Sequence, residues 1–153
     1  MDEIVARSLA KWPNVPAVYG WLDLDRRGNW LIKGQKIGNV ALREFIARNY
    51  AADPQGQWFF QNGPQRVYVR LAYTPLVVHH QGGALMDHCG RRFEASTAYQ
   101  DDEGSVLIEG ATTIALLDDR DLERYAEQAE TLPRIARADV AARFGFLPDP
   151  APR

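Results

Sequence analysis

A short turn pattern recurs along the chain and constrains the fold more than any other feature. Segments 25–34 and 101–110 match position for position as Asp-x-x-Gly-x, an apolar run and a second Gly, and Asp53-x-x-Gly56-x-Trp58 is a partial third copy. Glycine tolerates the left-handed backbone that closes a short turn, and aspartate readily bonds to backbone groups near its own position. The chain is therefore predicted to be rich in β-hairpins.

Each full copy of the pattern is followed by a predicted amphipathic helix. Asn39 precedes one helix and Asp118 the other, and both residue types accept hydrogen bonds from amides of a first helical turn. We therefore predict an internal duplication of a hairpin-plus-helix unit, with repeats over 18–73 and 84–130. The alternative is that common turn chemistry recurs independently.

Hydrophobic periodicity predicts the remaining elements. Helical spacing of apolar residues predicts helices over 2–12, after Asn39, over 119–130 and over 140–144. Alternation or short apolar runs predict a hairpin over 18–37 and strands over 57–61, 66–73, 75–81, 84–89, 92–99, 105–109 and 112–117. The predicted fold class is α+β, with antiparallel hairpins packed on two main helices.

The length of the chain is compatible with one domain. We predict a single α+β domain over 1–147 and a Pro-rich tail over 148–153 that has little to pack against. A hydrophobic share of 46% and a charged share of 25% are those of an ordinary globular protein, which excludes a disordered chain.

Several features favour a cytoplasmic protein. Cys89 is the only cysteine, so no disulfide can form within the chain. The N-terminal segment begins with acidic residues rather than with a secretory signal, and no run approaches the ~18 apolar residues of a membrane span. No phosphate-binding loop, dinucleotide fingerprint or nucleophile elbow occurs. We therefore expect no cofactor and no membrane partner.

Charge is distributed unevenly along the chain. Residues 26–70 carry eight Lys or Arg against two acids, a net charge of +6, whereas residues 94–130 carry eleven acids against two Arg, a net charge of −9. A basic half can bind nucleic acid, but the acidic half would repel it. We therefore expect the halves to attract each other within one chain or between two copies, which would produce a homo-oligomer.

The three histidines and the only cysteine fall within eleven residues, at His79, His80, His88 and Cys89. A two-residue turn at 82–83 would bring His79 and His88 to diagonal positions on one sheet face, with His80 and Cys89 on the other. At most a metal site of His79 and His88 survives, and it would need a carboxylate from elsewhere. We prefer histidines that lie at the surface or pack on the sheet, and we expect no metal.

A nucleophilic role for Cys89 would require a nearby base and a lowered thiol pKa. His88 is adjacent in sequence and would point away from Cys89 on a strand, and no oxyanion-hole loop accompanies them. A metal- or thiol-dependent enzyme around His79, His88 and Cys89 is therefore an alternative, and we expect a non-catalytic protein.

The stretch from 58 to 73 interleaves aromatic with basic side chains. Base stacking with phosphate neutralisation uses these residue types, but so does core packing beside a solvated arginine face. We assign most of the rings to the core. The predicted contact surface consists of Asn62, Arg66, Tyr68 and Arg70. In this hypothesis Arg66 anchors an acidic or carbonyl group and Tyr68 supplies flat apolar area.

Three segments resemble a family of small proteobacterial proteins of unknown function. They are Trp12-Pro13-Asn14-Val15-Pro16, Tyr19-Gly20-Trp21-Leu22 and, above all, the run from Gly56 to Val69. The likeness extends from Trp12 to about residue 145 and is looser after Gly82. The layout from Gly28 to Gly56 also resembles a second bacterial family of unknown function. That resemblance implies an α+β fold with repeated motifs and a signalling role, and neither family has established catalytic residues.

Together these observations favour a non-catalytic binding or regulatory module that contacts a protein or a small ligand near the loop 62–66. The alternatives are a nucleic-acid-binding protein that uses residues 26–70, and the enzyme described above. Exposure beside a concave surface would locate the site, and the aromatic candidates are Trp21, Trp30, Trp58 and Tyr68.

Overall fold

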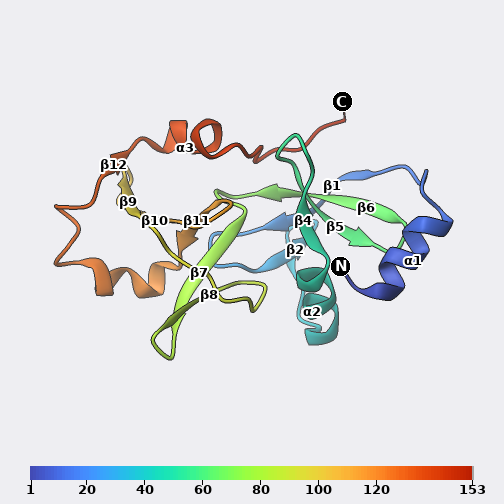
Figure 1. Cartoon of the computed structure of the whole chain (residues 1–153), viewed down its shortest axis with the longest axis horizontal. Helices are drawn as coiled ribbons and strands as arrows, with labels where there is room; N and C mark the ends of the chain where they lie inside the picture. Colours follow the sequence, from blue (N-terminus) through green and yellow to red (C-terminus); the bar gives the residue numbers. More distant parts are fainter. Residues whose placement is uncertain (153) are drawn as a thin grey trace. The chain divides into compact units, whose positions relative to one another are not determined.

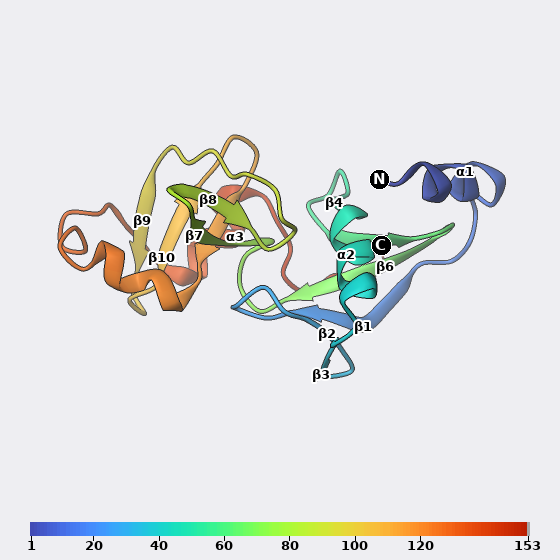
Figure 2. The ribbon, with the colours of Figure 1, turned by 90° about the horizontal axis from the view of Figure 1, so that it is seen from below.

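The chain forms two compact units in the computed structural model, which describes residues 1–152. The first unit comprises residues 1–25, 29–72 and the chain from Phe146 onward, and the second comprises residues 26–28 and 73–145. Figures 1 and 2 colour the chain along its sequence, so the elements of each unit can be followed by their labels. Each unit has its own sheet and its own helical segments.

The first unit is an α+β arrangement of a mixed sheet and two helices in the described part of the chain. Its elements are α1 (Glu3–Lys11), β1 (Val18–Leu24), β2 (Trp30–Ile32), β3 (Gln35–Lys36), α2 (Val40–Arg48), β4 (Tyr50–Ala52), β5 (Trp58–Asn62) and β6 (Gln65–Leu71). The strand order is β3-β2-β1-β6-β5-β4. The predicted first two helices and the first hairpin are confirmed.

The centre of the first sheet is a parallel pair, β1 and β6, flanked by antiparallel pairs. Sequence patterns predicted the hairpins because hairpins join neighbouring segments, whereas β1 and β6 lie more than forty residues apart in the sequence. The register between β1 and β6 shifts between Val18 and Leu22, where Gly20 adopts a φ of 77°. This irregularity changes which side chains of β1 face α2.

Local sequence explains how α2 begins and packs. The Asn39 side chain accepts a hydrogen bond of 2.9 Å from the amide of Leu42, as the sequence predicted. Ile46 is 1% exposed and packs into the core of the first unit, whereas Leu42, on the same stripe, remains 37% exposed. The helix therefore covers the sheet only in part.

The second unit also combines a six-stranded sheet with helical segments. Its elements are β7 (Leu76–Gln81), β8 (Ala84–Asp87), β9 (Ala98–Asp101), β10 (Val106–Glu109), β11 (Ile114–Leu117), the 3-10 helix η1 (Asp119–Tyr125), β12 (Arg134–Ile135) and α3 (Arg137–Phe144). The strand order is β12-β9-β10-β11-β7-β8, with β7 and β11 parallel. Its core cluster consists of Val78, Leu85, Val106, Ile108, Ala115 and Leu117.

The predicted helix over 119–130 is not an α-helix. Only Asp119–Tyr125 is helical, and it is a 3-10 helix. The Asp118 side chain accepts hydrogen bonds from the backbone and the guanidinium of Arg120, while the amide of Asp121 donates to the Asp118 carbonyl, which tightens the first turn. Leu122 and Tyr125 pack against the core cluster, as their spacing suggested. Of the two predicted main helices, only α2 is therefore an α-helix.

The Asp-x-x-Gly pattern forms the same turn at four places. In each, the amide four residues after Asp25, Asp53, Asp87 or Asp101 donates to the aspartate side chain, and the aspartate amide donates back to the carbonyl of that residue. The glycines have φ values of 82° to 86°. The turn at Asp87 was not predicted from the sequence, because an isolated bridge at Arg92 follows it rather than a long apolar strand.

The two fully matched motifs occupy different positions in their sheets. The Asp25 turn joins β1 to β2, next to the parallel pair, whereas the Asp101 turn joins β9 to β10. The turn whose place corresponds to Asp101 is the one at Asp53, between β4 and β5. The match between segments 25–34 and 101–110 is therefore not by itself a sign of duplication, because the same turn chemistry can recur independently.

The C-terminal segment packs more than its composition suggested. The amide of Leu71 donates to the carbonyl of Pro148, and the amide of Ala151 donates to the side chain of Gln57. Phe146 is 3% exposed. Residues 146–151 thus belong to the first unit, while Arg153, the last residue of the predicted tail, lies outside the described residues.

Candidate ligand groove

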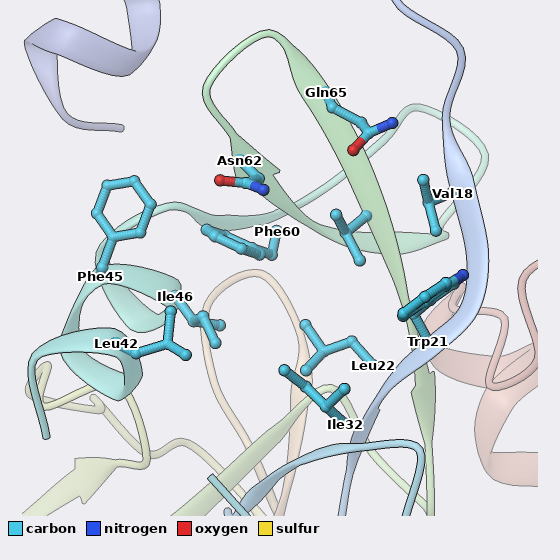
Figure 3. Close-up of a pocket in the computed structure, with 11 residues that line it drawn as sticks. Val18, Trp21, Leu22, Ile32, Leu42, Phe45, Ile46, Phe60, Asn62 and Gln65 are labelled. Atoms are coloured by element: carbon cyan, nitrogen blue, oxygen red, sulfur yellow. The ribbon is translucent and has the colours of Figure 1, made fainter. Parts of the chain in front are cut away.

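An apolar groove of about 390 Å³ lies between α2 and one face of the first sheet (Figure 3). It is lined by Val18, Trp21, Leu22, Ile32, Leu42, Phe45, Ile46, Phe60, Asn62, Gln65 and Val67. The volume is at the lower end of the ~300–1,000 Å³ typical of small-molecule sites. These lining side chains include no acid and no base in the described structure.

Two backbone features determine which side chains line the groove. One is the alternation of side chains along β5 and β6, and the other is the irregularity in β1. Phe60 and Asn62 share one face of β5, and Gln65 and Val67 share one face of β6. Because the backbone is irregular near Gly20, the consecutive residues Trp21 and Leu22 both line the groove. Regular alternation would have sent one of them to the opposite face.

The groove has a buried floor and an exposed apolar rim. Leu22, Ile46 and Phe60 are at most 5% exposed, whereas Trp21 is 48%, Ile32 39% and Leu42 37% exposed. Single exposed apolar residues are ordinary, but here three of them surround one concavity. Of the aromatic candidates, Trp21 is the exposed one that lines the groove. Trp30 is 3% and Tyr68 6% exposed, and Trp58 is half-buried and outside the groove lining.

Polar groups lie at two places around the groove. The side-chain amides of Asn62 and Gln65 lie at the β5–β6 turn, where Gln65 Nε2 donates to the carbonyl of Pro16 at 3.2 Å. Next to Ile32, Lys33 Nζ lies 4.0 Å from the centre of the Trp21 ring. Figure 3 shows the two amides on the β5–β6 hairpin and Trp21 on the neighbouring strand β1.

The structure separates the four predicted contact residues. Asn62 lines the groove, and Arg70 forms an ion pair of 2.7 Å with Asp23. Arg66 lies with its guanidinium 4.0 Å from the centre of the Phe59 ring. Tyr68 is buried, so its ring cannot supply the flat contact area that we predicted.

Tyr68 instead belongs to a buried polar cluster. Its hydroxyl donates to Asp53 Oδ2 at 3.0 Å, and its ring stacks on Tyr19 with the ring centres 4.8 Å apart. Burial raises the pKa of Tyr68. Burial alone would raise the pKa of Asp53 as well, but hydrogen bonds from Gln57 and Tyr68 lower it below its usual value. These contacts stabilise the turn at Asp53, and none of them involves a residue that lines the groove.

The three histidines line a second, polar cleft of about 440 Å³ in the second unit. Gln81 pairs with Ala84 and His79 with Met86, which is the register expected for the predicted two-residue turn at 82–83. His80 was predicted on the opposite face, yet it lines the same cleft because its ring reaches Tyr125 of η1, with Nε2 3.0 Å from the hydroxyl. His88 Nδ1 accepts from the amide of Val77 at 3.2 Å. Within residues 1–152, no three His, Cys, Asp or Glu side chains are placed to hold a metal ion.

The surroundings of Cys89 disfavour the thiolate form that a nucleophile requires. Burial, with the nearby charge of Asp87, raises the pKa of Cys89 to about 12. At neutral pH the thiolate population is therefore negligible.

Comparisons with known proteins identify a family but no specific function. The family described as "Protein of unknown function (DUF2946)" matches residues 1–151. The chain belongs to this family. No curated protein matches the sequence. In the described part of the chain, no helix is both long and apolar enough to cross a membrane.

Two crystal structures of proteins from a different family, DUF1285, resemble the structure of this chain. The protein from Silicibacter pomeroyi DSS-3 is 17% identical, with a TM-score of 0.55, and the match covers 83% of this chain and 84% of that one. The protein from Shewanella baltica OS155 is 14% identical, with a TM-score of 0.51, over 70% and 91% of the two chains. At these identities the likeness shows the fold and nothing about a ligand.

Proposed function

We propose that the protein is a non-catalytic binding module whose site is the apolar groove of the first unit. One observation carries the proposal: the exposed rim of Trp21, Ile32 and Leu42 surrounds a recess whose floor is already packed. Removing such apolar area from water is favourable by roughly 25 cal/mol per Å², so an apolar ligand gains free energy by filling the recess.

The groove also fits the expected location of the contact surface. Asn62, predicted as a contact residue, lines the groove at the β5–β6 turn, and Gln65 lies beside it in the predicted 62–66 loop. Arg66 and Arg70 engage a ring and a carboxylate of their own unit, so they anchor no ligand in this proposal. Small-molecule sites commonly combine apolar walls with a few polar groups of this kind.

The groove can be tested with a neutral apolar fluorophore and a matched pair of arginine variants. We expect N-phenyl-1-naphthylamine to bind the native protein with stoichiometric fluorescence enhancement. Leu42→Arg places a charge in the groove wall, and an unpaired charge there strongly disfavours an apolar ligand, so affinity should fall at least about tenfold. Val40→Arg changes the same helix at a position that is 55% exposed and outside the groove, and it should bind like the native protein.

Equal binding by the two arginine variants would contradict the assignment of the groove. Melting temperatures measured in parallel separate loss of the site from loss of the fold. Both positions are exposed, so neither substitution removes core packing.

We also propose that the two units descend from one duplicated segment. The sequence predicted repeats over 18–73 and 84–130, and the strand connectivity favours about 18–71 and 76–117 instead. Support comes from their connectivity: in each sheet an antiparallel hairpin (β1–β2 or β7–β8) precedes a three-strand meander (β4–β5–β6 or β9–β10–β11), whose last strand is parallel to the first strand of the hairpin. We further propose a cytoplasmic location, a regulatory role and a homo-oligomer, and these proposals rest on the sequence alone.

A further inference from the structure

Lys33 has an unusual backbone conformation beside the groove. It is the one non-glycine residue with a positive φ within residues 1–152, at 48°, and Gly34 follows at 81°. These angles are those of the two central residues of a type I′ turn, here between β2 and β3. Asn-Gly or Gly-Gly satisfies that turn with less strain than Lys-Gly.

The turn holds the Lys33 ammonium against the groove wall. The amide of Lys33 donates to the carbonyl of Trp21 at 3.1 Å, and Nζ lies 4.0 Å from the centre of the same residue's ring. The ring is part of the groove lining, and Ile32, the preceding residue, lines the groove as well. A strained backbone that fixes a charged group at a recess is a reason to look for a function of that group.

The charge that these contacts place at the groove is positive. Its lining contains no carboxylate, and the ammonium of Lys33 lies at its Trp21 side. Apolar walls and a cation at one place are complementary to a molecule with an apolar chain and an anionic head. The amides of Asn62 and Gln65, which face each other at the β5–β6 turn, mark the other end. Gln65 lies four residues before Val69 on β6, and Val69 pairs with Leu22 of β1, the neighbour of Trp21. At ~3.3 Å per residue the two ends are roughly 13 Å apart.

We infer that the groove binds a free, single-chain anionic amphiphile, with its carboxylate or similar head at Lys33 and its chain along the floor toward Asn62. This inference rests on the proposed function, since it names the ligand class of the same groove. The floor is recessed, with Leu22, Ile46 and Phe60 almost fully buried, and this suits a chain that enters the protein rather than a bilayer surface that the protein would have to penetrate.

The experiment compares three ten-carbon ligands, each below its critical micelle concentration: decanoate, 1-decanol and decyltrimethylammonium. Binding is followed by NMR through the indole N–H signals of the four tryptophans, of which Trp21 should shift most. We expect decanoate to bind most tightly and the cation most weakly. Affinity for carboxylates of increasing length should rise by up to about fourfold per methylene and then level off once the chain reaches Asn62.

Two asparagine variants isolate the ammonium from the fold. Lys33→Asn removes the charge but suits the left-handed turn, so its melting temperature should stay equal or rise while decanoate affinity falls roughly two- to fivefold, to the level of decanol. Lys36→Asn removes an exposed lysine three residues away, opposite Leu31, which faces away from the groove. It should leave decanoate binding unchanged.

The outcomes separate this inference from the proposed function. If decanol binds as tightly as decanoate and Lys33→Asn has no effect, the anionic head is refuted while the apolar groove stands. If the protein sediments with vesicles of anionic phospholipid but ignores monomeric decanoate, the free amphiphile is refuted. If neither decanoate nor N-phenyl-1-naphthylamine binds, the proposed function itself fails.

Discussion

The buried contact between Tyr68 and Asp53 predicts a measurable coupling energy in the first unit. Asp53 is 9% exposed and accepts hydrogen bonds from the amides of Gln55 and Gln57 and from the Tyr68 hydroxyl, at 2.9, 2.9 and 3.0 Å. Hydrogen bonds to a charged group contribute about 1.5–3 kcal/mol each when one partner is removed. The carboxylate therefore stabilises both its own turn and a neighbouring strand.

The expected free energies follow from which groups each substitution leaves without a partner. Tyr68→Phe removes one donor and should cost about 1.5 kcal/mol. Asp53→Ala leaves two amides and a buried hydroxyl without their acceptor and should cost about 3–4 kcal/mol. The double variant leaves no orphaned hydroxyl, so it should be about 1.5 kcal/mol more stable than the sum of the two losses predicts.

Urea unfolding followed by tryptophan fluorescence is a suitable assay, because all four tryptophans lie in residues 1–72 and report on the first unit. Asp87→Ala is a control, since Asp87 belongs to the second unit and the same type of turn there accepts from the amides of Cys89 and Arg91. Combined with Tyr68→Phe it should show additive effects. A coupling between Asp53 and Tyr68 below about 0.5 kcal/mol would refute the reasoning.

The same carboxylate should make the first unit less stable in acid. The pKa of Asp53 in the folded protein lies below its usual value, so the stabilisation is fully present above the unfolded pKa of about 3.9 and is lost as pH falls through the folded pKa. The native protein should therefore lose stability more steeply than Asp53→Asn between about pH 5 and pH 2.

Two further predictions concern the second unit. Cys89, with a pKa raised to about 12, should react with iodoacetamide at pH 7.5 far more slowly than glutathione does, and rapid alkylation would revive the thiol-dependent alternative. Gly110→Ala would place its Cβ 2.6 Å from Cζ of Phe93, which packs on the core cluster, and should cost about 1–3 kcal/mol by calorimetry. Gly38→Ala, with nothing within 4 Å of the added carbon, should cost little, and an equal loss in both would show that steric overlap is not the cause.

Local signals in the sequence were sufficient for much of the fold. The Asp-x-x-Gly turns, the cap at Asn39 and the alternating strands each depend on residues within a few positions of one another, and α2, the hairpins and the α+β class follow from them. The 3-10 form of η1 could not be predicted, because the Asp118–Arg120 contacts that tighten its first turn compete with an ordinary capping box.

The candidate site was only partly accessible to sequence reasoning. Asn62, predicted as a contact residue, lines the groove from the exposed end of β5, next to a turn. The burial of Tyr68 could not be predicted, because its alternation with Val67 and Val69 does not show that Tyr19 and Asp53 cover that face. A signal for Lys33 was present in the Lys-Gly pair of a short hairpin, but its meaning depends on the position of Trp21.

What the sequence determined by itself is the set of short-range choices: where the chain turns, where helices start and which residues are too apolar to remain in water. Tertiary structure alone decided the parallel pairing of β1 with β6, the irregularity near Gly20 that turns Trp21 toward α2, and hence the groove. The reason is that parallel pairing joins segments distant in sequence, so its register is fixed by packing across the whole sheet rather than by any neighbouring residue.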